Sequence, residues 1–310
     1  MATLQDALTA YRICAKAEGK SAKTIGWTTD AVGYFADFLG GEGIELETID
    51  AQSLRRFILA LQAKPAFSSH RFTRPSNRPL SPETVASYTR AIKGFFSFLE
   101  REGIILSNPM AKVKLPKTPK KVMPTFSEQE IGKLLSQPNK KSDEGFRDYA
   151  IMATLLDCGI RVSELCGLTI SDVDLENGYL RVMCKGAKER RVPIGYTLTK
   201  VLLKYKVAHR PASSSMSFFL TRDGRPIARK RVQVMIKKYG ARVGIQTRCS
   251  PHTFRSTSAV SYLRHGGDAF SLQRKLGHAT LAMTRRYCEL SDSDVRARHL
   301  ASSPLDKLTS

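Results

Sequence analysis

The chain has 310 residues, 42% of them hydrophobic, and its 50 Lys and Arg against 28 Asp and Glu give a formal net charge of +22. This length suggests about two domains, and no apolar run approaches the roughly 20 residues of a membrane-spanning helix, which argues against an integral membrane protein. A basic excess of this size favours a polyanionic partner. Because the cations are spread along the chain rather than gathered in one amphipathic helix, we favour nucleic acid over an anionic membrane surface.

Cysteine usage and the N-terminal segment bear on the cellular compartment. The N-terminal segment has no basic, apolar signal sequence, and the six cysteines form no C-x-x-C pair. This pattern indicates neither a zinc site nor a disulfide framework. We therefore expect reduced thiols, no metal site and a cytoplasmic protein.

The first part of the chain is predicted to be helical. Apolar residues recur at helical spacing over residues 1–39 and again over residues 49–61, where Asp50 is expected to cap the helix. Ser81, followed by a proline at the first helical position, is expected to begin a long helix. Between these helices, residues 64–80 contain three prolines and three arginines, which predicts an exposed basic loop.

A stretch rich in proline and lysine, residues 107–124, divides the chain. Proline keeps such a segment extended and lysine keeps it solvated, so we expect a linker between a helical domain over residues 1–106 and a second domain over residues 125–310. A basic tether suits a protein that closes around a polyanion, although an ordinary exposed linker can have the same composition.

The second domain is predicted to combine helices with a small hairpin. Helical patterns cover residues 127–135, 145–156 and 161–168. Residues 179–183 and 189–194 alternate like short strands and flank a K-G-A-K sequence, which predicts an antiparallel hairpin. From Leu198 onward the pattern is again mostly helical. The chain as a whole is therefore expected to be mainly α, with a small antiparallel β-sheet.

The sequence Ser250-Pro251-His252-Thr253-Phe254-Arg255 predicts the start of a helix that faces an anion. Serine is a favoured N-cap and proline suits the first helical position. His252 and Arg255 then share one face of the first turn, where backbone N–H groups and the helix dipole attract negative charge. An isolated H-x-x-R is also found on ordinary capped surface helices.

Tyr287 follows His278 by nine residues. Gly277 is expected to end a helix in the left-handed conformation, and His278 begins the next segment. Arg285 and Arg286 precede the tyrosine and would favour its phenolate form. Taken alone, such a tyrosine could equally be a half-buried packing residue.

Two further cations lie upstream of this region. Arg161 follows a Gly-Ile turn at a predicted helix start, and Glu164, three residues later, can brace it. Lys185 lies at the predicted hairpin tip, from which an ammonium group could reach a leaving group. Each feature is also common on protein surfaces, as a surface Arg–Glu pair or a solvated turn lysine.

Taken together, these residues resemble the catalytic set of the tyrosine recombinase (phage integrase) family. In chain order the set is Arg161, Lys185, His252, Arg255, His278 and Tyr287. The resemblance rests on the G-I-R-V-S-E-L, C-K-G-A-K-E-R-R-V-P, S-P-H-T-F-R and L-G-H-A sequences, and on steps of 23 residues from Arg255 to His278 and nine to Tyr287. K-T-I and the S-P-E-T-V…F-F-S-F-L-E helix extend it to the N-terminal half. The chain departs from the family pattern at Cys158, Ser256 and Cys288, none of which is a catalytic position.

The resemblance implies a fold and a nucleophile. The fold would be a SAM-like helical core-binding domain of four to five helices followed by an α+β catalytic domain. Tyr287 would attack the phosphorus and form a 3′-phosphotyrosyl link with release of a 5′-hydroxyl. Arg161 and Arg255 would clamp the nonbridging oxygens of the phosphate.

The remaining members of the set would move or hold protons. Lys185 would protonate the leaving 5′ oxygen and His252 would act as acid and base toward the tyrosine. His278 would hydrogen-bond the phosphate, and Glu164 would orient its neighbours. No metal ion, cofactor or ATP is expected, because the cations stabilise charge and the covalent link keeps the bond energy.

The resemblance also implies partners. Family members act as tetramers on two double-stranded recombination sites, so we expect DNA and other recombinase subunits. The tail, with Leu300, Leu305 and Leu308, would dock on a neighbouring subunit or fold back on its own domain. DNA contacts are expected from a set of basic residues in the first domain: Lys20, Lys23, Arg71, Arg90 and Lys93. Residues 229–238 of the second domain are a further candidate.

The biological role has several alternatives. The tail resembles those of integrases from transposons and conjugative elements, so integration or excision of a mobile element is expected. The chain lacks an extra N-terminal arm-binding domain, so a phage integrase that reads distant arm sites is less expected. A Xer-type resolvase of chromosome or plasmid dimers would share every catalytic residue. A relaxase of the topoisomerase IB kind and a catalytically silent DNA-binding protein are less consistent with the helical first domain and the intact catalytic set.

Overall fold

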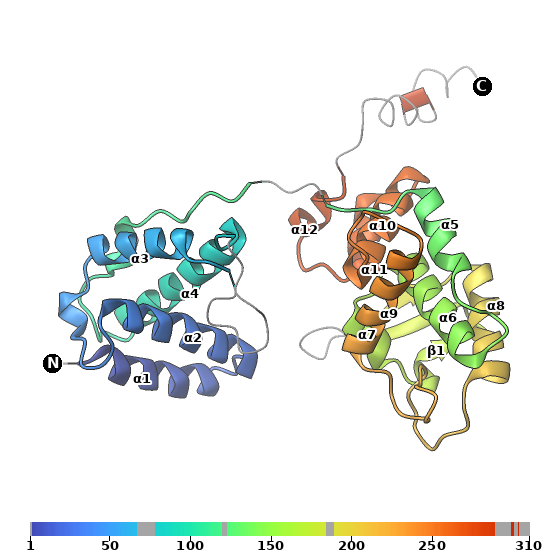
Figure 1. Cartoon of the computed structure of the whole chain (residues 1–310), viewed down its shortest axis with the longest axis horizontal. Helices are drawn as coiled ribbons and strands as arrows, with labels where there is room; N and C mark the ends of the chain where they lie inside the picture. The colour runs from blue at the N-terminus through green and yellow to red at the C-terminus, as the bar shows by residue number, and fades with distance from the viewer. Residues whose placement is uncertain are drawn as a thin grey trace. The chain divides into compact units, whose positions relative to one another are not determined.

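The computed structural model describes residues 2–66, 78–119, 123–183, 189–288, 299–300 and 303. The chain divides into two compact units, Met1–Lys121 and Val122–Ser310. Figure 1 labels helices α1 to α12 and strand β1. Among the described residues, no helix combines the length and the apolar character needed to cross a membrane.

The first unit is a helical bundle. Its helices and short 3-10 turns are α1 (Leu4–Ala17), α2 (Ala22–Leu39), η1 (Leu46–Thr48), α3 (Ala51–Ala63), α4 (Pro82–Arg101) and η2 (Pro109–Lys112). The expected caps are confirmed: the Asp50 carboxylate accepts the Ser53 N–H at 2.7 Å, and the Ser81 hydroxyl accepts the Thr84 N–H at 3.2 Å. The predicted basic loop falls largely on residues 67–77, which lie outside the described residues.

Aromatic side chains fill the core of the first unit. Phe35 contacts Phe57 edge to face, with ring centroids 5.1 Å apart, and Tyr11 contacts Phe98 in the same way at 5.3 Å. All four rings are buried. Burying one such side chain contributes about 1.5–3 kcal/mol, so these rings help to hold helices α1 to α4 together.

The expectation of an extended, solvated linker over residues 107–124 is wrong for its first part. The Asn108 side chain accepts the Met110 N–H at 2.9 Å and begins the η2 turn. Met110 and Val113 are buried in the core of the first unit, where η2 contacts α3 and α4. The composition concealed this docking, because the two apolar residues are scattered among prolines and lysines. Residues 120–122 lie outside the described residues.

The second unit combines a three-stranded antiparallel sheet with helices. Its elements are α5 (Glu128–Ser136), α6 (Asp143–Cys158), α7 (Val162–Gly167), η3 (Ile170–Asp172), β1 (Val173–Asp174), β2 (Tyr179–Met183), β3 (Glu189–Pro193), α8 (Tyr196–Lys204), the π-turn η4 (Tyr205–His209), α9 (Arg229–Arg242), α10 (Pro251–Arg264), α11 (Ala269–Leu276) and α12 (Leu281–Arg285). The predicted β2–β3 pairing is confirmed, whereas the short strand β1 was not predicted. The described chain from Leu198 onward is mostly helical, as predicted, although residues 211–228 after η4 form no helix.

The buried face of the sheet and helix α6 form the main core of the second unit. Leu180 and Val192 face each other across β2 and β3 and are fully buried, as are Ile151 and Leu155 of α6. The alternation of apolar residues along the strands therefore has the expected cause, one face of the sheet against the core.

Helix α10 is buried on nearly all sides and packs against α6. Its buried positions carry small residues, among them Ser256, Thr257 and Ser258, which permit the two helices to approach closely. The buried Thr257 hydroxyl uses its hydrogen-bonding capacity by donating to the Thr253 carbonyl at 2.8 Å and accepting from the Phe126 N–H at 2.9 Å. This packing brings the first turn of α10 to the C-terminal end of α6, where the candidate site lies.

Candidate active site

The turn between α6 and α7 presents Arg161. Helix α6 ends at Gly159, whose φ of +62° is left-handed, and a Cβ there would lie 3.0 Å from side-chain atoms of Leu276 and Ser258. Arg161 then caps α7: its backbone N–H and its Nη1 each donate to the Glu164 carboxylate at 2.8 Å. The side chain of Arg161 remains 39% exposed, so its guanidinium is braced on one side and open to solvent on the other.

Glu164 is a buried carboxylate shared by two arginines. Besides its bonds to Arg161, it accepts Nη1 and Nη2 of Arg190 at 3.0 and 2.9 Å. Burial alone would raise the pKa of Glu164, but the hydrogen bonds from Arg190 and Arg161 and the charge of Arg190 outweigh it, and the net pKa lies below its ordinary value. The carboxylate is therefore ionised at neutral pH.

The first turn of α10 supplies Arg255 and His252, as its cap and proline predict. The Ser250 hydroxyl accepts the Thr253 N–H at 3.2 Å, and Pro251 is the first helical residue. Arg255 is only 3% exposed, and it donates to the carbonyls of Gly159 at 2.7 Å and Leu276 at 2.9 Å. Burial and the nearby charge of Arg161 lower the Arg255 pKa. Arg255 thus joins the end of α6 to the end of α11 and places a buried positive charge between them.

His278 follows Gly277, which ends α11 with a φ of +65° as predicted. Its Nε2 lies 3.1 Å from Nη2 of Arg255, and its Nδ1 lies 2.9 Å from the Thr284 hydroxyl. Because a guanidinium only donates, we assign Nε2 as the acceptor and Nδ1 as the protonated nitrogen. Burial, followed by the charges of Arg255 and Arg161, lowers the pKa of His278 to about 4, so the ring is neutral near pH 7.

Tyr287 lies directly after the short helix α12. Its N–H donates to the Thr284 carbonyl at 2.9 Å, and its ring lies nearly parallel to that of His278, with centroids 6.0 Å apart. The residue is 7% exposed and packs among apolar side chains that include Leu272 and Leu276. The tyrosine is therefore at the site, but its ring is packed rather than open to solvent.

The structure thus brings five of the six predicted catalytic residues to one junction of α6, α10, α11 and α12. They are Arg161, His252, Arg255, His278 and Tyr287. His252 belongs to this group electrostatically: burial, and then the charges of Arg255, Arg286, Arg248 and Arg161, lower its pKa. Lys185 lies outside the described residues. Within the described ranges, no three His, Cys, Asp or Glu side chains gather as metal ligands would.

Three residues of the site were missed by sequence reasoning: Arg190, Lys275 and Thr284. Arg190 had a usable signal, because it shares the inward face of β3 with the buried Val192 and an inward arginine needs a partner. Lys275 and Thr284 had no such signal in the sequence. Lys275 contacts the carbonyl of Asp157 and Thr284 contacts the ring of His278, and only the packing brings these groups together.

The predicted DNA-contacting residues of the first unit are exposed where they are described. These are Lys20, Lys23, Arg90 and Lys93, whereas Arg71 lies outside the described residues. Lys20 is paired with Glu18 at 2.8 Å, and Arg90 donates to the Ser87 hydroxyl at 3.1 Å. In the second unit, the exposed face of α9 carries the basic residues predicted over positions 229–238.

Comparison with known proteins assigns the family. The phage integrase family matches residues 124–294, and the phage integrase SAM-like domain matches residues 9–115. The chain belongs to the phage integrase family. This family member is 31% identical to the tyrosine recombinase XerC of Pelotomaculum thermopropionicum over 284 residues, which cover 88% of each chain. It is also 31% identical to the tyrosine recombinase XerD of Staphylococcus epidermidis, over 72% of this chain and 77% of that one. The predicted assignment as a tyrosine recombinase is confirmed.

Solved structures share the fold of this family member. A lambda integrase dimer bound to a COC′ core site has a TM-score of 0.72 at 18% identity, covering 92% of this chain and 95% of that one. The Tn1549 transposon integrase in complex with transposon right end DNA also has a TM-score of 0.72 at 18% identity, covering 95% and 98%. The predicted fold, a helical SAM-like domain followed by a mainly α catalytic domain with a small sheet, is confirmed.

Proposed function

We propose that the protein is a site-specific DNA recombinase that cuts and rejoins strands through a 3′-phosphotyrosyl link on Tyr287. The observation that carries this proposal is the convergence of Tyr287 with Arg161, Arg255 and two histidines at one junction of the second unit. A nucleophile, fixed cations and neutral imidazoles are what in-line attack on an anionic phosphodiester requires.

The two arginines would hold the scissile phosphate and stabilise the charge that develops in the transition state. Arg161 is braced by Glu164 yet partly exposed, so it would meet the phosphate from the solvent side. Arg255 is held from behind by two backbone carbonyls. A phosphate oxygen could replace Nε2 of His278 as the acceptor for Arg255. Nε2 would then be free, and once protonated it would donate a hydrogen bond to the phosphate.

Proton transfer would accompany the exchange of bonds. The oxygen of Tyr287 forms a bond to phosphorus while the bond to the 5′ oxygen breaks, and Lys185 would give that oxygen its proton. His252 would accept the tyrosine proton, because burial and neighbouring cations lower its pKa and keep it neutral near pH 7. Since the phosphotyrosyl link keeps the bond energy, religation by a 5′-hydroxyl needs no ATP, and the arginines and Lys185 would take the part that metal ions take elsewhere.

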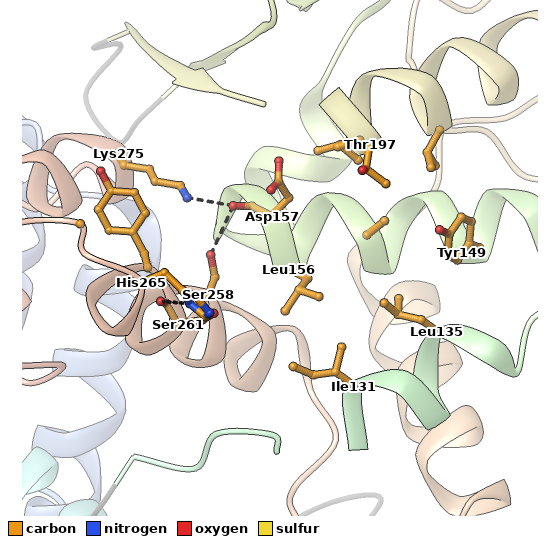
Figure 2. A pocket seen from close by; sticks show the side chains of 15 residues that line it. Ile131, Leu135, Tyr149, Leu156, Asp157, Thr197, Ser258, Ser261, His265 and Lys275 are labelled. Carbon is orange, nitrogen blue, oxygen red and sulfur yellow. Dashed lines mark hydrogen bonds between the residues drawn. The ribbon is translucent and has the colours of Figure 1, made fainter. Parts of the chain in front are cut away.

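Assembly on DNA would involve an apolar groove of about 470 Å³ in the second unit (Figure 2). Its apolar lining comes from α5, α6 and α8, including Ile131, Leu135, Leu156 and Val201. We propose that it receives the leucine-rich C-terminal tail of a neighbouring subunit in a tetramer on two DNA sites. A lambda integrase tetramer bound to a Holliday junction shares the fold, with a TM-score of 0.70. A tail bound to its own domain is the alternative outcome.

We further propose that the recombination integrates or excises a mobile element in the cytoplasm. A second role, Xer-type resolution of chromosome or plasmid dimers, is favoured by the XerC and XerD names of the 31% identical relatives. Sequencing the DNA ends that become covalently attached to the protein would distinguish the two roles. Ends of a mobile element support the first, and a single chromosomal or plasmid locus supports the second.

The decisive test is capture of covalent DNA adducts. The full-length protein is incubated with fragmented genomic DNA of its host, and adducts are recovered under denaturing conditions and sequenced. Tyr287→Phe should abolish the adducts and keep sequence-specific binding, whereas Tyr196→Phe, at a tyrosine of α8 that is 76% exposed, should form adducts normally. Adducts that persist in Tyr287→Phe overturn the nucleophile, and a wild-type protein that binds DNA but forms none is a silent DNA-binding protein.

A further inference from the structure

We propose that Arg190 is a positioning residue that fixes three catalytic elements relative to one another. These are the turn that presents Arg161, the strand that leads away from Lys185, and the turn that presents His278. The inference rests on the proposed function, because it assumes the catalytic roles given above, and it assigns to Arg190 no contact with the phosphate.

Arg190 is placed by the sheet. It lies opposite Val182 in the antiparallel register of β2 and β3, and its side chain, 10% exposed, points to the same side as the buried Val192. An arginine at such a position must find partners for its donors, because an unpaired buried charge is strongly destabilising. It finds them on two other elements of the second unit.

The first partner is Glu164 of α7. Arg190 donates from Nη1 and Nη2 to the two carboxylate oxygens, at 3.0 and 2.9 Å, in a forked arrangement. The same two oxygens accept the backbone N–H and Nη1 of Arg161. One carboxylate therefore links the position of the buried Arg190 to that of the partly exposed Arg161. Without Arg190, Glu164 would be held by Arg161 alone.

The second partner is the last turn of α11. Nε of Arg190 donates to the Lys275 carbonyl at 2.9 Å. A Cβ at Gly277 would lie 3.0 Å from Nη1 of Arg190, so the guanidinium lies directly against the turn that leads into His278. Nζ of Lys275 in turn donates to the Asp157 carbonyl at 2.9 Å, which is visible in Figure 2, and this bond returns the network to the end of α6.

The third element is the hairpin itself. Arg190 is the second residue of β3, and Lys185 precedes this strand in the segment that joins β2 to β3. The bonds from Arg190 to α7 and α11 anchor the base of β3. They would thus set the point from which the lysine reaches the leaving oxygen.

Only arginine meets this requirement. Its planar guanidinium donates from three nitrogens to two partners in one rigid group, whereas a lysine ammonium is a point charge on a flexible stem and cannot reproduce the fork. Arg190→Lys therefore keeps the positive charge but cannot make the forked hydrogen bonds to Glu164 and the bond to the Lys275 carbonyl at the same time. Arg147→Lys is a matched control: Arg147 is 5% exposed, donates to Asp148 at 3.0 and 2.7 Å and to the Leu220 carbonyl at 3.3 Å, and belongs to the same unit.

The experiment measures single-turnover cleavage and DNA affinity separately, with full-length protein and a DNA site recovered by adduct capture. Because a small misplacement of catalytic groups can lower a rate about 100-fold, Arg190→Lys should cleave between about 10- and 100-fold more slowly while its Kd changes less than about 3-fold. Arg147→Lys should lose thermal stability to a similar extent but cleave within about 3-fold of wild type.

A second substrate tests whether Arg190 also affects proton donation by Lys185. With sulfur in place of the bridging 5′ oxygen, the leaving thiolate needs no proton, so the deficit of Arg190→Lys should shrink but not vanish, because Arg161 and His278 remain displaced. An unchanged deficit would exclude the hairpin from the proposal. Equal cleavage losses in Arg190→Lys and Arg147→Lys, or a parallel loss of DNA affinity, overturn it. If Arg190→Lys does not fold, non-additive cleavage losses in Arg190→Gln, Glu164→Gln and the double variant serve instead. A wild-type protein without adducts refutes the proposed function and this inference with it, whereas a wild-type protein that cleaves, with equal losses in the two variants, overturns the inference alone.

Discussion

Glu164→Gln tests how much the buried carboxylate that holds Arg161 and Arg190 contributes to the stability of the second unit. The carboxylate accepts four hydrogen bonds, two from Arg161 and two from Arg190. Glutamine has nearly the same shape, but it keeps only one acceptor oxygen and turns an amide donor toward a guanidinium. The mutation therefore removes the negative charge while leaving the buried Arg190 in place.

The magnitude follows from burial. Removing one partner of a buried ion pair destabilises a protein by about 3–5 kcal/mol, and a hydrogen bond to a charged group contributes about 1.5–3 kcal/mol. Arg161 is partly exposed and can be hydrated, whereas Arg190 cannot. We therefore expect a loss of about 3 kcal/mol in the free energy of unfolding of the second unit at pH 7.

The effect should depend on pH in a definite direction. The pKa of folded Glu164 lies below its ordinary value of 4.5, so ionisation favours the folded state above that value. This stability is lost as the pH falls through the lower pKa of the folded state. The wild-type protein should therefore lose its advantage over Glu164→Gln as the pH is lowered from 7 to below 4.5.

Guanidinium unfolding of the full-length protein measures the loss, with a control contained in the chain. Far-ultraviolet circular dichroism follows both units, whereas fluorescence follows Trp27, the single tryptophan of the sequence, on α2 of the first unit. The Trp27 transition should not move in the variant. Glu176→Gln, at an exposed glutamate of the second unit, should change stability by less than about 0.5 kcal/mol. A loss below about 1 kcal/mol in Glu164→Gln, or one that is the same at pH 4 and pH 7, would refute the reasoning.

Three further predictions concern the segment around Tyr287. Thr284→Val removes the acceptor of the His278 Nδ1 proton, so it should destabilise the second unit by about 1–3 kcal/mol and change the ring tautomer seen by nitrogen NMR, while Thr284→Ser should preserve both. Gly277→Ala should cost more stability in thermal unfolding than Gly244→Ala, because both glycines have a positive φ but only the first would bring a Cβ against Arg190; equal losses would contradict that packing. Deleting the residues after Leu290 should impair strand exchange more than DNA binding in gel-shift and recombination assays, and an unaffected deletion would rule out a role for the tail.

The features that the sequence determined on its own are local. The start of α10 follows from Ser250 and Pro251, and the end of α11 follows from Gly277, because capping and a left-handed residue act within one helical turn. The β2–β3 pairing follows from alternation over five residues in each strand. The order and spacing of the predicted catalytic residues could also be recognised in the sequence, since they resemble a known family along the chain.

Tertiary structure decided what these residues touch. Arg255 meets a carbonyl 96 positions away, and Arg190 meets one 85 positions away, so no local pattern contains either contact. The docking of Met110 and Val113 on the first unit was hidden for the same reason. The neutral state of His278 and the ionised state of Glu164 likewise depend on burial and on cations supplied by other elements. Backbone preferences are encoded by neighbours in sequence, whereas charge state and hydrogen-bond saturation are set by neighbours in space.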